Sequence, residues 1–115
     1  MEQKPLARLC RTWQRRLRLQ DWRVEVRFAP SEEFPKDEQA RVEYDDTELT
    51  ATILLQDQGE PEVIERTLVH ELLHLRLAAW EAPYGHPPVE TAINLLADSL
   101  YAGYRRRRRK TNDAG

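Results

Sequence analysis

Hydrophobic residues follow a helical spacing in the first segment of the chain and alternate with polar residues in the next. Across residues 5–19 the apolar side chains recur every three or four positions, at Leu6, Leu9, Cys10, Trp13 and Leu17. This spacing predicts an amphipathic helix with one buried stripe. Over residues 22–28 the period changes to two, which predicts a half-buried strand.

Two further short segments predict strands. Residues 40–44 alternate again, and Thr50–Gln56 is rich in β-branched and apolar residues. An acidic loop (residues 30–38) precedes the first of them, and an aspartate turn separates the two. Because the connections are short, we expect a mainly antiparallel meander, with a mixed pairing at one edge allowed.

Two helices follow the strands. From Val63 to Trp80 apolar residues nearly encircle the predicted helix axis, so this helix should be buried on most sides. A proline-rich loop over residues 83–88 leads to a final helix over residues 88–104. The pattern predicts one α+β domain over residues 1–104, followed by a basic tail, residues 105–115, that we expect to be disordered.

Length and cysteine content narrow the class of protein. A chain of 115 residues makes a single domain. One cysteine, Cys10, excludes an internal disulfide and a site with several thiolate ligands. No segment resembles a secretory signal or a membrane span, so we expect a cytoplasmic protein without a membrane partner.

The charges are segregated although the net charge is only −2. Residues 28–98 hold sixteen acidic and four basic residues, and both ends of the chain are basic. A nucleic-acid-binding domain needs dominant positive charge on its binding face, so the acidic middle argues against that class. Contact with nucleic acid is possible only through six consecutive cations, from Arg105 to Lys110, which are also typical of a solvated helix end.

The chemical signal is His70-Glu71-Leu72-Leu73-His74, the pattern H-E-x-x-H inside a predicted helix. Histidines four residues apart lie on one face of a helix, so both imidazoles can converge on one metal ion. Glu71 is rotated by about 100° from His70, beside the metal rather than on it. There it can act as the general base of zinc-dependent hydrolysis.

A catalytic zinc site needs a third protein ligand and an open fourth position. Glu90, in the first turn of the final helix, is the favoured third ligand, with His86 as the alternative. Asn94 follows Glu90 by one helical turn, where its amide could orient a histidine ligand. Glu81 lies about 16 Å along a continuous helix from His70, out of reach.

These residues resemble the gluzincin group of zinc metallopeptidases, in particular its small single-domain members, the minigluzincins, and short metallopeptidases of phages and bacteria. The resemblance implies that His70, His74 and Glu90 bind zinc and that Glu71 is the general base. Asn94 stands where the thermolysin-like pattern has an aspartate. Members of the group bind a peptide substrate as an added strand at a sheet edge, for which Thr50–Gln56 is the expected segment.

Two loop residues are candidates for stabilising the oxyanion, Tyr84 and His86, because both flank the predicted site. The function expected from the sequence is therefore hydrolysis of a peptide bond by a small zinc peptidase. The alternative is a non-catalytic or latent zinc-binding module that engages a protein or nucleic-acid partner. An open fourth coordination position on the zinc would favour the peptidase, and a position closed by a fourth protein ligand would favour the non-catalytic module.

Overall fold

The computed structural model describes the backbone of residues 1–57 and 59–114 and, except at residues 82 and 104–114, their side chains. The fold is α+β, as predicted, with helices and one three-stranded mixed sheet. The elements follow in the order α1 (Gln3–Arg16), β1 (Arg23–Ala29), a 3-10 turn (Ser31–Glu33), β2 (Ala40–Asp45), β3 (Thr50–Gln56), α2 (Pro61–Arg76), α3 (Ala78–Tyr84) and α4 (His86–Ala114).

The strand order is β1-β3-β2, so β3 lies in the centre of the sheet. β2 pairs with β3 in an antiparallel hairpin, whereas β1 pairs with β3 in parallel. The predicted meander is therefore wrong in its order, and the mixed edge is the pairing of β1. The prediction that Thr50–Gln56 accepts an added peptide strand is also wrong, because both edges of β3 are already paired.

The physical reason for the central position of β3 is its burial. Ala51, Ile53 and Leu55 face the helices and are almost fully buried, which an edge strand would leave partly in water. The turn between β2 and β3 is held by Asp45, whose carboxylate accepts hydrogen bonds from the backbone N–H groups of Thr47 and Glu48. The free edges of the sheet thus belong to β1 and β2.

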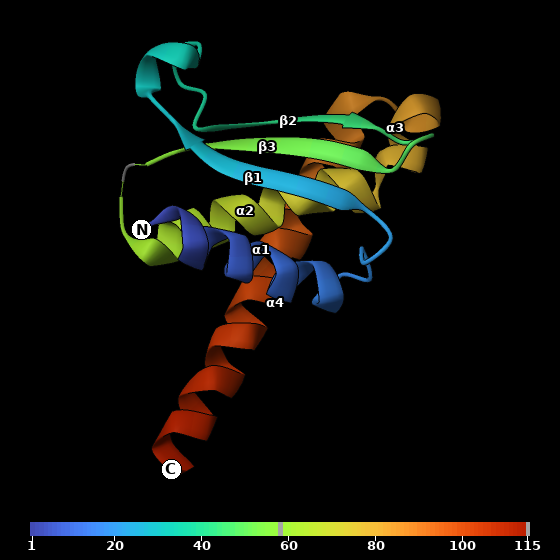
Figure 1. Ribbon diagram of the computed structural model, residues 1–115. Coiled ribbons are helices and arrows are strands. Elements are labelled where there is room, and N and C mark those ends of the chain that lie inside the picture. The colour runs from blue at the N-terminus through green and yellow to red at the C-terminus, as the bar shows by residue number, and fades with distance from the viewer. Residues whose placement is uncertain (58, 115) are drawn as a thin grey trace.

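Helices α1 and α2 lie against one face of the sheet, and α4 crosses beneath α2 and runs away from the body of the protein (Figure 1). A buried hydrogen bond joins the first two: the indole N–H of Trp13 donates to Glu65 Oε2 at 2.8 Å. Gln14 donates to the carbonyl oxygens of Leu19 and Trp22, which fixes the connection from α1 to β1. These contacts hold α2 in a fixed place under the sheet.

The region after α2 differs from the sequence prediction. The helix ends at Arg76, and Leu77 (φ −105°, ψ 13°) breaks the ladder before the short helix α3. Pro83, expected in a loop, lies inside α3, and α4 begins at His86 rather than at residue 88. The expected loop over residues 83–88 is therefore reduced to a single residue, Gly85, because its neighbours on both sides are helical.

α4 packs on α2 through buried residues four apart, Val89, Ile93, Ala97 and Tyr101. This spacing is one helical turn, so the stripe faces α2 along its whole length. The backbone of α4 continues to Ala114, through the segment for which the sequence predicts a disordered tail. The side chains from Arg105 to Lys110, through which the sequence allows contact with nucleic acid, lie outside the described residues.

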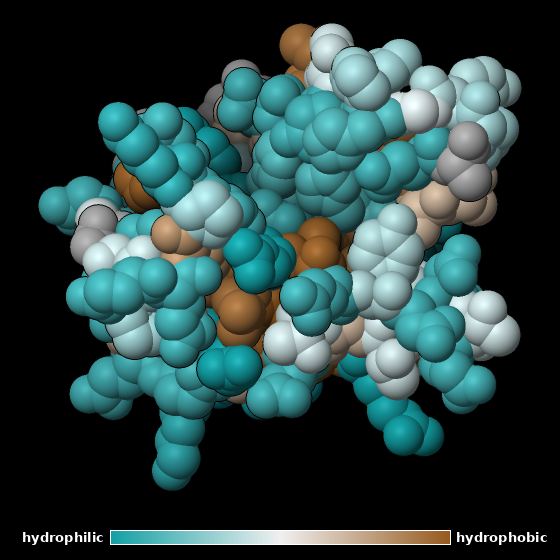
Figure 2. Space-filling model, turned by 90° about the horizontal axis from the view of Figure 1, so that it is seen from above, coloured by the Kyte–Doolittle hydropathy of each residue, from teal (hydrophilic) through white to brown (hydrophobic). Residues whose placement is uncertain are grey.

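The surface in Figure 2, seen from above, is mostly hydrophilic with a compact apolar patch near its middle. The exposed large apolar side chains include Leu95, Leu96 and Leu100 on α4. Among the described residues, no helix combines the length and apolarity that crossing a membrane requires.

Gly85 is the reversal point that returns the chain from α3 to α4. Its backbone conformation, with φ of 84° and ψ of 164°, is one that residues other than glycine rarely adopt. We expect Gly85→Ala to lower the free energy of unfolding by about 1–3 kcal/mol through backbone strain, since no atom crowds the added Cβ. Gly103→Ala, inside α4, is the control, and urea unfolding that shows equal stabilities for the two variants would contradict this.

Cys10 is buried on the inner face of α1, and burial raises the pKa of its thiol to about 12. The folded chain should therefore react with a thiol reagent at pH 8.5 at least about 100-fold more slowly than the urea-unfolded chain. The raised pKa also makes the stability of the fold depend on pH. The pKa of the Cys10 thiol is higher in the folded chain than in the unfolded chain, so folding is favoured while the thiol stays protonated. This contribution to the free energy of unfolding is complete below pH 9 and is lost as the pH rises towards 12. In urea unfolding between pH 9 and 12, the Cys10→Ala protein should lose less of its free energy of unfolding than the parent. An equal loss in the two proteins would show that Cys10 is not the source of the pH dependence.

Candidate metal site

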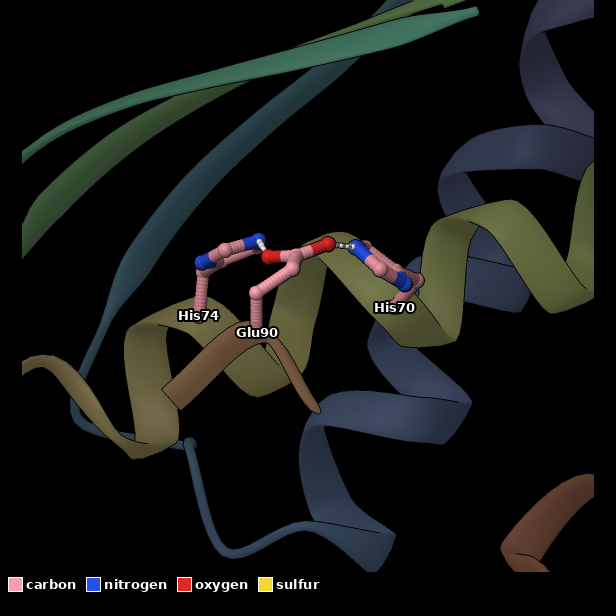
Figure 3. A group of neighbouring side chains, drawn as sticks. All are labelled: His70, His74 and Glu90. Atoms are coloured by element: carbon pink, nitrogen blue, oxygen red, sulfur yellow. Dashed lines mark ion pairs between the residues drawn. The ribbon is translucent and has the colours of Figure 1, made fainter. Parts of the chain in front are cut away.

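The site is built on one face of α2, where His70 and His74 project towards α4. The Glu90 carboxylate, from the first turns of α4, lies between the two imidazoles (Figure 3). Its Oε1 is 2.8 Å from His70 Nε2, and its Oε2 is 3.0 Å from His74 Nε2. One residue of α4 thereby meets both histidines of the H-E-x-x-H pattern.

These three side chains form a group that could hold a metal ion. One potential ligand atom of each lies within 4.8 Å of the others. Glu90 Oε2 is buried, and the described residues supply it with no donor in hydrogen-bond geometry, despite the short distance to His74. A buried carboxylate oxygen without a donor is costly. A cation among the three side chains would satisfy this oxygen, so the residues present fit a metal.

Two pKa shifts at the site follow from burial. Burial lowers the pKa of His74 below the ordinary value for histidine, with His70 and His86 adding to the effect against the opposing pull of Glu90. The neutral imidazole, which is the metal-binding form, is therefore favoured. Burial, with the negative charges of Glu90 and Glu38, raises the pKa of Glu71 to about 7.

A cavity of about 410 Å³ opens beside the metal-binding group. Its wall includes His70, Glu71 and Glu90, so the carboxylate next to the first histidine faces the same space as two of the possible ligands. Glu71 is only 8% exposed and stands outside the three-residue group. Its carboxylate thus lies beside the group of possible ligands and not in it, as the helical rotation predicts.

His86 lies next to the group without belonging to it. Its ring stacks on that of His74, with centroids 6.1 Å apart and planes within 5°. Its Nδ1 pairs with Glu81 Oε1 at 2.9 Å, and this hydrogen bond raises the pKa of His86. His86 Nε2 is 4.0 Å from Glu90 Oε2. The chain thus brings its third histidine to the edge of the site rather than into it.

Sequence reasoning missed the pairing of Glu81 with His86. It assumed a helix unbroken from residue 63 to 80, which would carry Glu81 away from the site. The break at Leu77 turns α3 instead, and Glu81 comes within hydrogen-bond distance of the first residue of α4. The sequence predicts a loop over the six residues from Pro83 to Pro88, and a loop does not specify a hydrogen bond between Glu81 and His86.

Two other predicted residues lie differently from expectation. Asn94 lines the cavity, and within the described part of the chain no direct hydrogen bond joins it to His70 or His74. Tyr84 is 61% exposed and stacks on Trp80, and it is not part of the cavity wall.

Comparisons with protein-family models, with curated proteins and with solved structures gave no match to this chain. The expectation of a gluzincin-type site therefore depends on the residues of the motif.

The site predicts a clear order of metal affinities. Glu90→Ala and His74→Ala should each weaken binding of a divalent metal at least about 10-fold, because each removes a ligand atom from the group of three. His86→Ala and Glu81→Ala, which change the same residue types just outside the group, should have a much smaller effect. Competition with a chromogenic chelator measures the four affinities, and a larger loss from His86→Ala than from Glu90→Ala would place the third ligand at His86.

Proposed function

We propose that this chain is a small zinc-dependent peptidase of the gluzincin type. The observation that carries the proposal is the meeting of two histidines and a glutamate from separate helices beside a cavity that also contains Glu71. A structural metal site alone has no need of a buried carboxylate beside its ligands. Peptide-bond hydrolysis needs both parts, a Lewis acid and a base.

Zinc is the metal that suits the donor set best. Two imidazole nitrogens and one carboxylate oxygen are a common protein contribution to catalytic zinc sites, whereas calcium and magnesium prefer oxygen ligands alone. Bound there, zinc would supply a Lewis acid that polarises a carbonyl group and lowers the pKa of water. His70, His74 and Glu90 would hold it between α2 and α4.

Glu71 has the role of proton carrier in this proposal. Its carboxylate lies in the cavity next to the ligand His70, without belonging to the ligand group. From this position it removes a proton from the attacking water and delivers that proton to the leaving amine. Its burial on α2 fixes the side chain in one place, which a general base requires.

The peptide substrate is proposed to lie along β2 rather than along β3. β2 is an edge strand, and its first residue, Ala40, lines the same cavity as the ligands, together with Gln39 just before it. An extended peptide can pair with the free backbone groups of such an edge. This places its scissile bond over α2, consistent with the resemblance to peptidases that bind substrate as an added strand.

One observation favours a second candidate function. His86 Nε2 lies 4.0 Å from Glu90 Oε2, close enough for a small rotation to bring it to a metal held by the other three residues. A site closed by four protein ligands is structural rather than catalytic. The chain would then be a zinc-binding module without hydrolytic activity, in which Glu71 has no chemical task.

The substitution Glu71→Gln distinguishes the two functions. It keeps the size of the side chain but removes the proton acceptor, so peptidase activity should fall at least about 100-fold. Zinc affinity should stay close to that of the parent, because Glu71 is not a ligand. Cleavage of a peptide library, followed by mass spectrometry, gives the activity, and chelator competition gives the affinity.

The matched control is Glu60→Gln, because Glu60 is exposed and lies at the start of the same helix. This substitution should leave the peptidase activity and the zinc affinity unchanged. A parent protein that binds one zinc per chain but cuts no peptide, and whose zinc affinity drops on His86→Ala, would establish the structural alternative. Loss of zinc in the Glu71→Gln protein would make Glu71 a ligand or an essential support.

A further inference from the structure

The cavity beside the metal-binding group is strongly acidic. Five of its described wall residues carry a carboxylate, namely Asp37, Glu38, Glu71, Glu90 and Asp98. They come from three parts of the fold: the loop before β2, helix α2 and helix α4. Arg66 is the one cation among the described residues of this wall, and its guanidinium lies over the ring of Tyr101, 5.5 Å from the centroid.

Glu71 provides an independent sign that this space receives a ligand. It is more than nine-tenths buried and lines the cavity, and within the described residues no hydrogen bond or ion pair joins its carboxylate to a donor or a cation. The two charged groups that act on it most strongly are other carboxylates, those of Glu90 and Glu38. A carboxylate held in a largely buried position among like charges is costly, and positive charge in the cavity would offset that cost.

A divalent metal at His70, His74 and Glu90 would supply only part of this charge. With every carboxylate ionised, the five carboxylates and one guanidinium carry a net charge of −4, and two positive charges reduce this to −2. The remaining carboxylates are those of Asp37, in the loop before β2, and Asp98, two turns after Glu90 on α4, and both residues are exposed. Glu38 is partly neutralised by its 3.1 Å ion pair with Arg41.

From this arrangement we infer that the cavity is a specificity subsite for a lysine or arginine side chain of the substrate, next to the bond that is cleaved. This inference rests on the proposed peptidase function. The aliphatic stem of such a side chain would lie along Ala40 and the buried Ala97, and its cationic end would reach the rim carboxylates Asp37 and Asp98. Long cationic side chains are suited to this division between an apolar stem and a charged head.

The test compares substrates that differ only in charge. Cleavage sites in a peptide library are first mapped, and matched peptides with arginine or the isosteric, neutral citrulline at the neighbouring position are then compared. The zinc-loaded parent should cut the arginine peptide with at least about 10-fold higher kcat/KM, the loss expected when a charge-assisted hydrogen bond is removed. The difference should appear mainly in KM, because the interaction is made in the ground state as well.

The variant Asp37→Asn/Asp98→Asn removes the rim charges without touching the ligands or Glu71. Its preference for arginine should fall to about 3-fold or less, while its zinc affinity and its activity on the citrulline peptide stay close to the parent values. Glu32→Gln/Glu48→Gln makes the same change of net charge at exposed positions outside the cavity and should keep the full preference. An equal preference in all three proteins, or none in the parent, would overturn the inference.

A binding experiment separates the failure of the subsite from the failure of the proposed activity. The ¹⁵N-labelled, zinc-loaded Glu71→Gln protein is titrated with N-acetyl-arginine amide and with N-acetyl-citrulline amide. Amide shifts confined to residues of the cavity wall, seen with the arginine compound and lost in the Asp37→Asn/Asp98→Asn background, support the subsite even if no peptide is cut. Equal binding of the two compounds, or no binding of either, refutes it even if peptides are cleaved.

Discussion

The placement of the Glu90 carboxylate between His70 and His74 is the contact on which the rest of the site depends. The two histidines are fixed to each other by one turn of α2, but Glu90 arrives from a helix that begins after a sharp reversal. The stripe of Val89, Ile93 and Ala97 packs α4 on α2 and so holds the carboxylate at this height. Apolar packing along the two helices therefore sets the geometry of a polar centre.

The same packing makes the site costly in the absence of a cation. Glu90 Oε2 is buried without a donor among the described residues, and Glu71 is buried among like charges. Such groups are tolerated because the hydrophobic core around α2 is extensive, with Leu68, Val69 and Leu72 fully buried on the other sides of the helix. Unfavourable electrostatics concentrated in one cavity of an otherwise apolar helix layer are typical of functional sites.

The arrangement also links the sheet to the chemistry proposed for the cavity. Because β3 occupies the centre of the sheet, β2 is left at the edge, and the residues just before and at its start, Glu38 to Ala40, line the cavity. α2 carries the histidines, α4 carries Glu90 and Asp98, and the loop before β2 carries Asp37. A peptide along β2 would thus pass the proposed metal and the acidic wall together, which connects strand order with substrate choice.

The sequence by itself determined the local features: the three strands, the buried helix α2 and the spacing that sets His70 and His74 on one face. These depend on hydrophobic period and on helical geometry, which act over a few residues. Strand order, the break at Leu77, the start of α4 at His86 and the pairing of Glu81 with His86 were decided only by the tertiary structure. Each depends on contacts between distant segments, where burial of β3 and the packing of α4 outweigh local preference. The choice between Glu90 and His86 had the same origin, because both follow the reversal at Gly85 and only the packing of α4 shows which one meets the two histidines.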